Sequence, residues 1–251
     1  MSDYLVCRLY AALASWGAPA VGESRPTATW PGRGAVLGLL GAALGIRRDD
    51  VERQTALDES VGFGVKQVSP GVLTRDYHTV QIPPPQKRVT YRTRRDELRV
   101  SKDRLNTILS SRDYRCDGLW TLALWSTPQA TLSLDEIASA VERPRFMLYL
   151  GRKSCPLSTP LAPRIVQAGC LKDALDSVFE PGDGSRLTLD ERLLGRVDTR
   201  VYAWEGGSTL LDGQAQSVES SEVWDQPLDR RRWQFTRRLE YRRFVNVDEA
   251  S

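Results

Sequence analysis

The sequence predicts an α+β fold of the ferredoxin-like type, also the skeleton of RNA-recognition-motif proteins, with an inserted β-hairpin and a small β-rich C-terminal lobe. Two observations predict this fold. Segments with strand-like and helical patterning follow one another in the order strand, helix, strand, strand, helix, strand. A long excursion, residues 69–117, separates the second strand from the third, where this fold normally has a tight hairpin. We therefore expect a ferredoxin-like domain over residues 1–155 and a smaller lobe over residues 156–251.

The first strand and the first helix are predicted within residues 4–46. Residues 4–10 alternate in the manner of a half-buried strand, and a loop rich in Gly, Pro and Ser follows. Residues 34–46 predict a helix whose four glycines, at positions 34, 38, 41 and 45, share one face. Because each interior glycine costs a helix up to about 1 kcal/mol relative to alanine, this face indicates close approach by another element. Alternatively, the leading end, entered through Arg33 and Gly34, presents backbone N–H groups to a phosphate.

The later elements of the first domain are predicted from apolar runs and helical spacing. Ser133 and Glu136 form a capping box, and the apolar residues that follow keep the spacing of an amphipathic helix. An unstructured loop as long as residues 69–117 would be unusual, so that segment is expected to be an extended β-hairpin. The expected elements are a polar helix near 49–59, strands at 61–68 and 119–125, a helix at 133–142 and a fourth strand at 146–150.

The C-terminal lobe carries weaker signals. Turns are expected at residues 182–185 and 206–207, and residues 199–204 fit a strand. Residues 231–244 fit either a strand or a helix, because their periodicity does not separate the two. The lobe is therefore predicted to be β-rich.

Charge is concentrated in two segments. Residues 86–104 hold eight Lys/Arg against three Asp/Glu, and residues 225–243 hold seven Arg against three acids. The whole chain has a formal net charge of only +3, so the remainder is acidic. Such concentration predicts a surface that binds a polyanion. The alternative, two solvated faces balanced by acids elsewhere, stays open.

Several function classes lack their sequence signals. There is no phosphate-loop, zinc-protease or nucleophile-elbow motif. The longest apolar run, residues 34–46, is shorter than the roughly 20 residues that a membrane helix needs, and no secretory signal is visible, so a cytoplasmic protein is expected. With one histidine and no C-x-x-C pair, we expect no metal, no cofactor and four free, mostly buried thiols at Cys7, Cys116, Cys155 and Cys170.

Several stretches, in their order along the chain, together resemble the CasD-type RAMP subunit of the type I-E CRISPR surveillance complex, Cascade. The resemblance implies a ferredoxin-like RAMP palm with a protruding thumb, and a non-catalytic role in antiviral defence. It also implies that the subunit holds the 5′ handle of the guide RNA (crRNA), contacts the large subunit and the adjacent backbone subunit, and meets target DNA only through the complex, with no membrane partner. The matching stretches are YLVCRL, SWGAP, residues 25–50, RDYHTV, LWTLALWSTPQAT, PRFMLYLGRKSCPL and the aromatic and basic residues at 232–241.

The residues expected to bind RNA are mostly basic or aromatic. Arginines neutralise phosphates, while aromatic rings stack unpaired bases at about 1 to 3 kcal/mol each. An alternative is that the tyrosines only pair across the hairpin and that the basic pair at 152–153 marks a surface turn. The expected set is Arg25, Arg33, Gly34, Tyr77, His78, Arg88, Arg92, Arg94, Arg95, Lys102, Arg152 and Lys153.

Two other functions remain open. Metal-independent cleavage of repeat RNA needs a general acid and base near neutral pH, and His78, with Tyr77 beside it and Lys87 along the chain, is the one candidate. A lone histidine is more often structural, and in the subtype that the chain resembles a separate subunit cuts the repeat, so we expect no catalytic residues. The third hypothesis is a scaffold whose basic segments meet acidic proteins.

Overall fold

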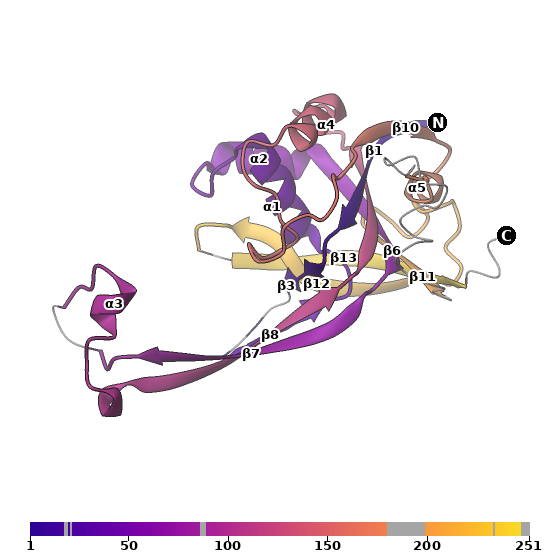
Figure 1. Cartoon of the computed structure of the whole chain (residues 1–251). Helices are drawn as coiled ribbons and strands as arrows, with labels where there is room; N and C mark the ends of the chain where they lie inside the picture. The colour runs from indigo at the N-terminus through magenta and orange to yellow at the C-terminus, as the bar shows by residue number, and fades with distance from the viewer. Residues whose placement is uncertain (18–19, 21, 86–88, 180–198, 233, 247–251) are drawn as a thin grey trace.

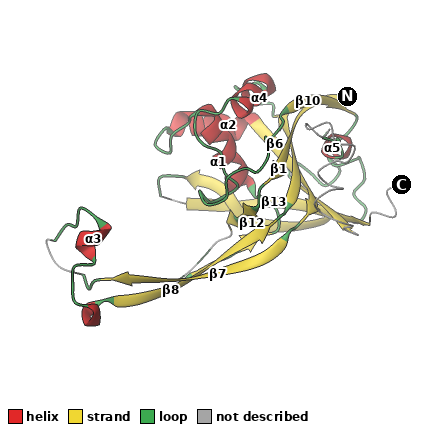
Figure 2. Cartoon of the chain, viewed as in Figure 1, coloured by secondary structure: helices red, strands yellow, loops and turns green. Residues whose placement is uncertain are grey.

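The computed structural model describes residues 1–17, 20, 22–85, 89–179, 199–232 and 234–246 (Figure 1). It is a mixed α/β structure with predominantly antiparallel sheets (Figure 2). Its elements are β1 (Ser2–Tyr10), β2 (Leu13–Ala14), β3 (Trp16–Gly17), β4 (Ser24–Arg25), β5 (Thr27–Ala28), α1 (Arg33–Leu44), α2 (Val51–Ser60), β6 (Val61–Ser69), β7 (Val72–Ile82), α3 (Arg94–Glu97), the 3-10 helix η1 (Lys102–Arg104), β8 (Asn106–Cys116), β9 (Leu119–Ser126), α4 (Leu134–Glu142), β10 (Arg164–Ala168), α5 (Leu171–Leu175), β11 (Thr199–Trp204), β12 (Glu219–Asp229) and β13 (Gln234–Asn246).

The main sheet has seven strands in the order β10-β1-β9-β6-β11-β13-β12. Its first face packs Leu5, Leu122 and Trp120 into the larger core with residues of α1, α2 and α4. Its other face packs Val6 and Trp204 into a second core with α5. Strand β1 is therefore buried on both faces rather than half-buried, because the alternation of its residues separates two cores and not a core from solvent.

The predicted helices and strands between residues 34 and 142 are confirmed. The helices expected at 34–46, 49–59 and 133–142 are α1, α2 and α4, and the strands expected at 61–68 and 119–125 are β6 and β9. The capping box is formed: Ser133 Oγ accepts the backbone N–H of Glu136 at 3.2 Å, and Glu136 Oε2 accepts that of Ser133 at 2.8 Å.

The fourth strand predicted at residues 146–150 is wrong. Only an isolated bridge between Tyr149 and Pro156 occurs there. The strand that pairs with β1 on the side away from β9 is β10, from Ser2↔Ala168 to Val6↔Arg164. Residues 145 and 146 instead donate their backbone N–H groups to the carbonyls of residues 43 and 42. These bonds satisfy carbonyls at the end of α1, which a helix leaves unpaired.

The region expected to form a C-terminal lobe shares the main sheet. Residues 199–204 form β11 as predicted, and the ambiguous segment 231–244 is resolved as a strand, β13. Gly206 and Gly207 leave β11 with φ angles of 92° and 138°, in keeping with a turn, whereas the turn predicted at residues 182–185 lies outside the described residues. The boundary expected at 155/156 does not coincide with a break in the sheet.

The glycine face of α1 approaches its neighbours closely at both ends but not in the middle, and a Cβ on Gly45 would lie 3.0 Å from the Cβ of Arg145. A Cβ on Gly34 would lie 3.1 Å from the Asp225 carbonyl oxygen and 3.2 Å from the ring of Phe235. On Gly38 and Gly41 a Cβ would find its nearest neighbours at ordinary contact distances of 3.6 and 3.8 Å. The expectation of close approach is therefore confirmed at Gly34 and Gly45 and wrong at Gly38 and Gly41.

Candidate nucleic-acid interface

A two-stranded antiparallel ribbon leaves the body of the molecule and ends in α3 and η1 (Figure 1). We call residues 72–116 the arm. Its strands β7 and β8 pair in register from Val72↔Cys116 to Ile82↔Asn106, which confirms the hairpin expected within residues 69–117. At its base, β8 also pairs with β2 and β4. Since an isolated two-stranded ribbon is only marginally stable in water, these contacts anchor the arm to the body.

The base of the arm brings together basic side chains from two distant parts of the chain. Arg152 donates Nη1 to the Asp113 carbonyl at 3.1 Å and Nη2 to the Arg25 carbonyl at 3.0 Å, and its guanidinium lies 4.8 Å from the centre of the Tyr114 ring. Arg25 and Lys153 are exposed beside this contact. The structure therefore gathers Arg25, Arg152 and Lys153, although about 127 residues separate the first two in the sequence.

An ion pair that sequence reasoning missed holds the two strands together at this base. Arg75 Nε and Nη2 donate to Asp113 Oδ1 and Oδ2 at 2.8 and 3.1 Å across the register pair. This hydrogen bond holds the pKa of the Asp113 carboxyl below its ordinary value. Its sequence signal was weak, because the pairing partner of Arg75 follows only from the register of the hairpin.

The middle of the arm carries Tyr77 and His78 on opposite faces, because successive strand residues point to opposite sides. The Tyr77 side chain is 64% exposed. His78 Nε2 lies 2.5 Å from Asp76 Oδ2, on the same face of the ribbon. The two neighbours in sequence are thus separated by the thickness of the ribbon.

The tip of the arm presents several exposed cations. Arg92, Arg95 and Lys102 are exposed, and among the ion pairs of the described residues none includes them. Arg94 is also exposed but pairs with Glu97 and donates to the Gln81 carbonyl. Arg88 lies outside the residues that the structure describes. The tip therefore offers positive charge that neighbouring acids only partly balance.

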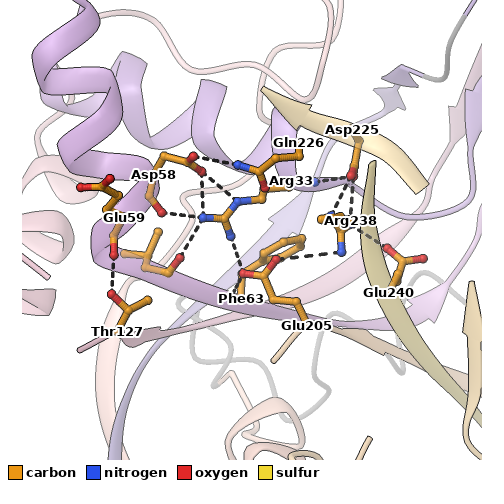
Figure 3. A network of polar contacts seen from close by, with 11 residues as sticks. Arg33, Asp58, Glu59, Phe63, Thr127, Glu205, Asp225, Gln226, Arg238 and Glu240 are labelled. Carbon is orange, nitrogen blue, oxygen red and sulfur yellow. Dashed lines mark hydrogen bonds and ion pairs between the residues drawn. The ribbon is translucent and has the colours of Figure 1, made fainter. Parts of the chain in front are cut away.

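Arg33 is buried in a network of polar contacts and does not lie on a surface (Figure 3). Gly34 beside it is half-buried against Asp225 and Phe235, so the structure corrects the expectation for both residues. Arg33 Nε donates to Asp58 Oδ1 at 2.9 Å, and Nη1 contacts Glu205. Its backbone N–H donates to Asp225 Oδ2 at 2.7 Å. The leading end of α1 thus already binds an anion, an internal carboxylate of β12, and so is not open to a phosphate.

The same network includes Arg238, which belongs to the second basic segment, residues 225–243. Arg238 lies with 8% of its side chain exposed between Asp225, at 2.7 Å, and Glu240, at 2.8 Å. Burial raises the pKa of Glu205, although Arg33 and Arg238 oppose this. The other ion pairs in residues 225–243 are Arg231 and Arg232 with Asp229, Arg237 with Glu222, Arg242 with Glu219 and Arg243 with Asp212. Six of the seven arginines in this segment therefore pair with acids among the described residues, which favours the alternative of solvated charge balanced by acids over a polyanion surface.

A family model described as CRISPR-associated protein (Cas_Cas5) matches residues 4–245. The chain belongs to the Cas5 family. It is 42% identical over 193 residues to the CRISPR system Cascade subunit CasD of Escherichia coli (strain K12), with 73% of this chain and 80% of that protein covered.

Solved structures show the same fold for this Cas5 protein. One, described as a CRISPR RNA-guided surveillance complex, superposes with a TM-score of 0.63 at 24% identity over 97% of this chain and 89% of the other. Another, described as the crystal structure of a Cas protein, gives a TM-score of 0.57 at 22% identity over 97% and 94%. The family resemblance stated from the sequence is confirmed.

Three further features of the Cas5 protein concern metal ligands, thiols and membrane helices. Within those ranges, no group of three or more His, Cys, Asp and Glu residues is arranged to hold a metal ion. The four thiols are free, with Cys7 and Cys155 buried and Cys116 and Cys170 partly exposed, and burial raises the pKa of Cys7 to about 12. None of the described helices combines the length and the apolar character needed to cross a membrane.

Proposed function

We propose that this Cas5 protein is a non-catalytic RNA-binding subunit of a type I-E Cascade complex. In this role it holds the 5′ handle of crRNA, contacts the large subunit and the adjacent backbone subunit, and meets target DNA only through the assembly. The observation that carries the proposal is the projecting arm, whose tip exposes Arg92, Arg95 and Lys102, while most arginines of the C-terminal hairpin pair with acids of the protein. Membership of the family supports the assignment.

The topology supports a ferredoxin-like palm as the body of the subunit. Four adjacent strands stand in the order β10-β1-β9-β6, and each neighbouring pair is antiparallel. Along the chain these strands alternate with α1, α2 and α4 in the strand-helix-strand-strand-helix-strand order. The arm is inserted between β6 and β9, where a thumb would project from such a palm.

We infer that RNA contacts the arm at three levels. Arg92, Arg94, Arg95 and Lys102 neutralise phosphates at the tip, and Tyr77 provides an exposed ring for stacking halfway along. Arg25, Arg152 and Lys153 extend the cationic path at the base. Arg88 remains a candidate by its place in the sequence.

The arrangement of the arm favours binding over cleavage. His78 and Tyr77 lie on opposite faces, so they cannot act as acid and base on one phosphate without twisting the ribbon. Asp76, the partner of His78, holds the imidazole on its own face. We expect His78→Ala to leave repeat-RNA processing intact in a reconstituted complex, as measured by gel analysis of the crRNA ends. Loss of cleavage in an assembled complex would favour the alternative function, a metal-independent endoribonuclease.

The direct test is handle-RNA binding at several salt concentrations. Replacing Arg92, Arg94, Arg95 and Lys102 with glutamine removes up to four phosphate contacts. Each lost contact makes the slope of log affinity against log salt shallower by about 0.7, so the full change is about 3. An unchanged slope in a folded variant would remove the arm from the RNA site. It would instead favour the scaffold hypothesis, in which the arm meets acidic proteins.

A further inference from the structure

A cavity of about 310 Å³ lies between α1, α2 and the turn that joins β12 to β13. Its volume is at the lower end of the range of small-molecule sites, about 300 to 1,000 Å³. None of its lining residues belongs to the arm or to the base of the arm. The lining divides into an apolar floor and a basic rim.

The floor includes two of the glycines of α1. Gly38 and Gly41 line the cavity, yet packing requires neither, since a Cβ at either position would meet only ordinary contacts. Both residues lower the stability of the helix relative to alanine. Their missing side chains leave an open floor beside Leu37, Ile46 and Leu57, which a flat ring can contact.

The rim carries three arginines, Arg48, Arg230 and Arg231. Arg230 is partly buried, and its Nη2 donates to a neutral acceptor, the Gly34 carbonyl, at 3.1 Å. Among the ion pairs of the described ranges, none includes Arg230. Burial lowers the pKa of the Arg230 guanidinium, and the charge of Arg48 lowers it further, while Asp58 opposes them. A bound anion would relieve both effects.

The two carboxylates of the lining are already engaged. Asp58 accepts hydrogen bonds from Arg33 Nε at 2.9 Å and from Gln226 Nε2 at 2.7 Å. Asp229 accepts the backbone N–H of Arg231 at 2.8 Å and pairs with its side chain at 3.5 Å. Neither carboxylate is therefore devoted to Arg230, and the rim keeps an excess of positive charge.

We propose that this cavity binds a nucleoside phosphate, with the ring on the glycine floor and the phosphate between Arg48 and Arg230. The combination of an apolar floor and a cationic rim suits a ligand with a flat ring at one end and an anion at the other. A free nucleotide and one nucleotide of an RNA strand share this chemistry. The site goes beyond the proposed role of the arm, because it lies on other elements.

The first experiment titrates AMP, and separately inorganic phosphate, into the isolated full-length chain by calorimetry. AMP is expected to bind at least tenfold more tightly than phosphate. Gly38→Leu, which fills the floor, and Arg230→Gln, which keeps a donor for the Gly34 carbonyl, should each weaken AMP binding at least tenfold. Arg48→Gln alters an exposed side chain and serves as a third variant if either of the others fails to fold. Arg237→Gln is the matched control, since Arg237 is exposed on the same hairpin and pairs with Glu222 away from the cavity.

A second measurement separates the two sources of the ligand. If the cavity takes a nucleotide of the strand, AMP binds the isolated chain but not the RNA-loaded complex, and Arg230→Gln also weakens handle-RNA binding. If it takes a free nucleotide, AMP binds both with equal affinity. AMP binding does not depend on the arm. The AMP test can therefore succeed when the salt-slope test of the arm fails, and it can fail when the salt-slope test succeeds.

Two results would overturn the proposal. Folded cavity variants could bind AMP as tightly as the unaltered chain, or AMP could bind no more tightly than inorganic phosphate. If variants that bind AMP normally also fail to join the other protein subunits, the cavity would be identified as a protein-docking site. Circular dichroism and thermal melting establish that each variant is folded.

Discussion

The two basic segments of this Cas5 protein have nearly the same local charge but opposite environments. Residues 86–104 lie largely at the tip of a ribbon, where several cations have no acidic partner among the described residues. Residues 225–243 form much of the β12–β13 hairpin, where ion pairs hold most arginines and two of them, Arg238 and Arg243, are buried in the body. The comparison teaches that local charge density locates arginines but does not say whether they face a ligand or an internal carboxylate.

The largest expected effect comes from removing a buried charge of the hairpin. Arg238→Ala leaves Asp225, Glu240 and Glu205 without their shared partner, and breaking a buried pair in this way costs about 3 to 5 kcal/mol. Arg95→Ala at the tip should change the free energy of unfolding by less than about 0.5 kcal/mol. Urea unfolding of both variants measures the contrast, and equal destabilisation would contradict it.

Substitutions in the arm should affect RNA binding more than substitutions in the C-terminal hairpin, the reverse of their effects on stability. Glutamine at Arg92, Arg95 and Lys102 should make the salt slope of handle-RNA affinity shallower by about 2. Glutamine at Arg232, Arg237 and Arg242 removes the same charge from side chains that already have acidic partners, so the slope should change little. Equal changes would show that net charge, and not the arm, governs the affinity.

One end and the middle of the glycine face offer a sharper comparison within one helix. Gly34→Ala places a Cβ 3.1 Å from the Asp225 carbonyl oxygen, so we expect a loss of about 1 to 3 kcal/mol from overpacking. Gly38→Ala meets only ordinary contacts, and the helix should gain up to about 1 kcal/mol. Thermal and urea unfolding give both values. A stabilising alanine at position 34 would show that the hairpin does not press on α1.

The smallest effect concerns pH at the base of the arm. Because the pKa of Asp113 is lowered in the folded state, its ion pair with Arg75 stabilises the protein above the unfolded pKa of about 3.9. This contribution is lost as the pH falls through the lower, folded pKa. Asp113→Asn should therefore weaken the protein at neutral pH and flatten the acid limb of a stability profile measured between pH 2 and pH 6. An unchanged acid limb would show that other carboxylates control it.

Local patterns predicted those elements whose signals lie within a few residues of one another. Ser133 and Glu136 predict the start of α4 because the two partners of the capping box lie only three residues apart in the sequence. The fourth strand was misplaced because the apolar run at 146–150 has strand-like composition, while the segment that pairs with β1 is the short β10. Residues 145 and 146 donate their backbone N–H groups to carbonyls at the end of α1, and this long-range contact cannot be read from the local pattern.

The sequence by itself determined the order of most elements, the inserted hairpin, the concentration of charge and the family. The tertiary structure alone decided which basic residues face solvent. Arg33 is buried because Asp58 and Glu205, about 25 and 172 residues away, meet it across α1, α2 and the end of β11. The arm stays exposed because its two strands pair mainly with each other. Such pairings depend on how distant strands are ordered in a sheet, and no local pattern encodes that order.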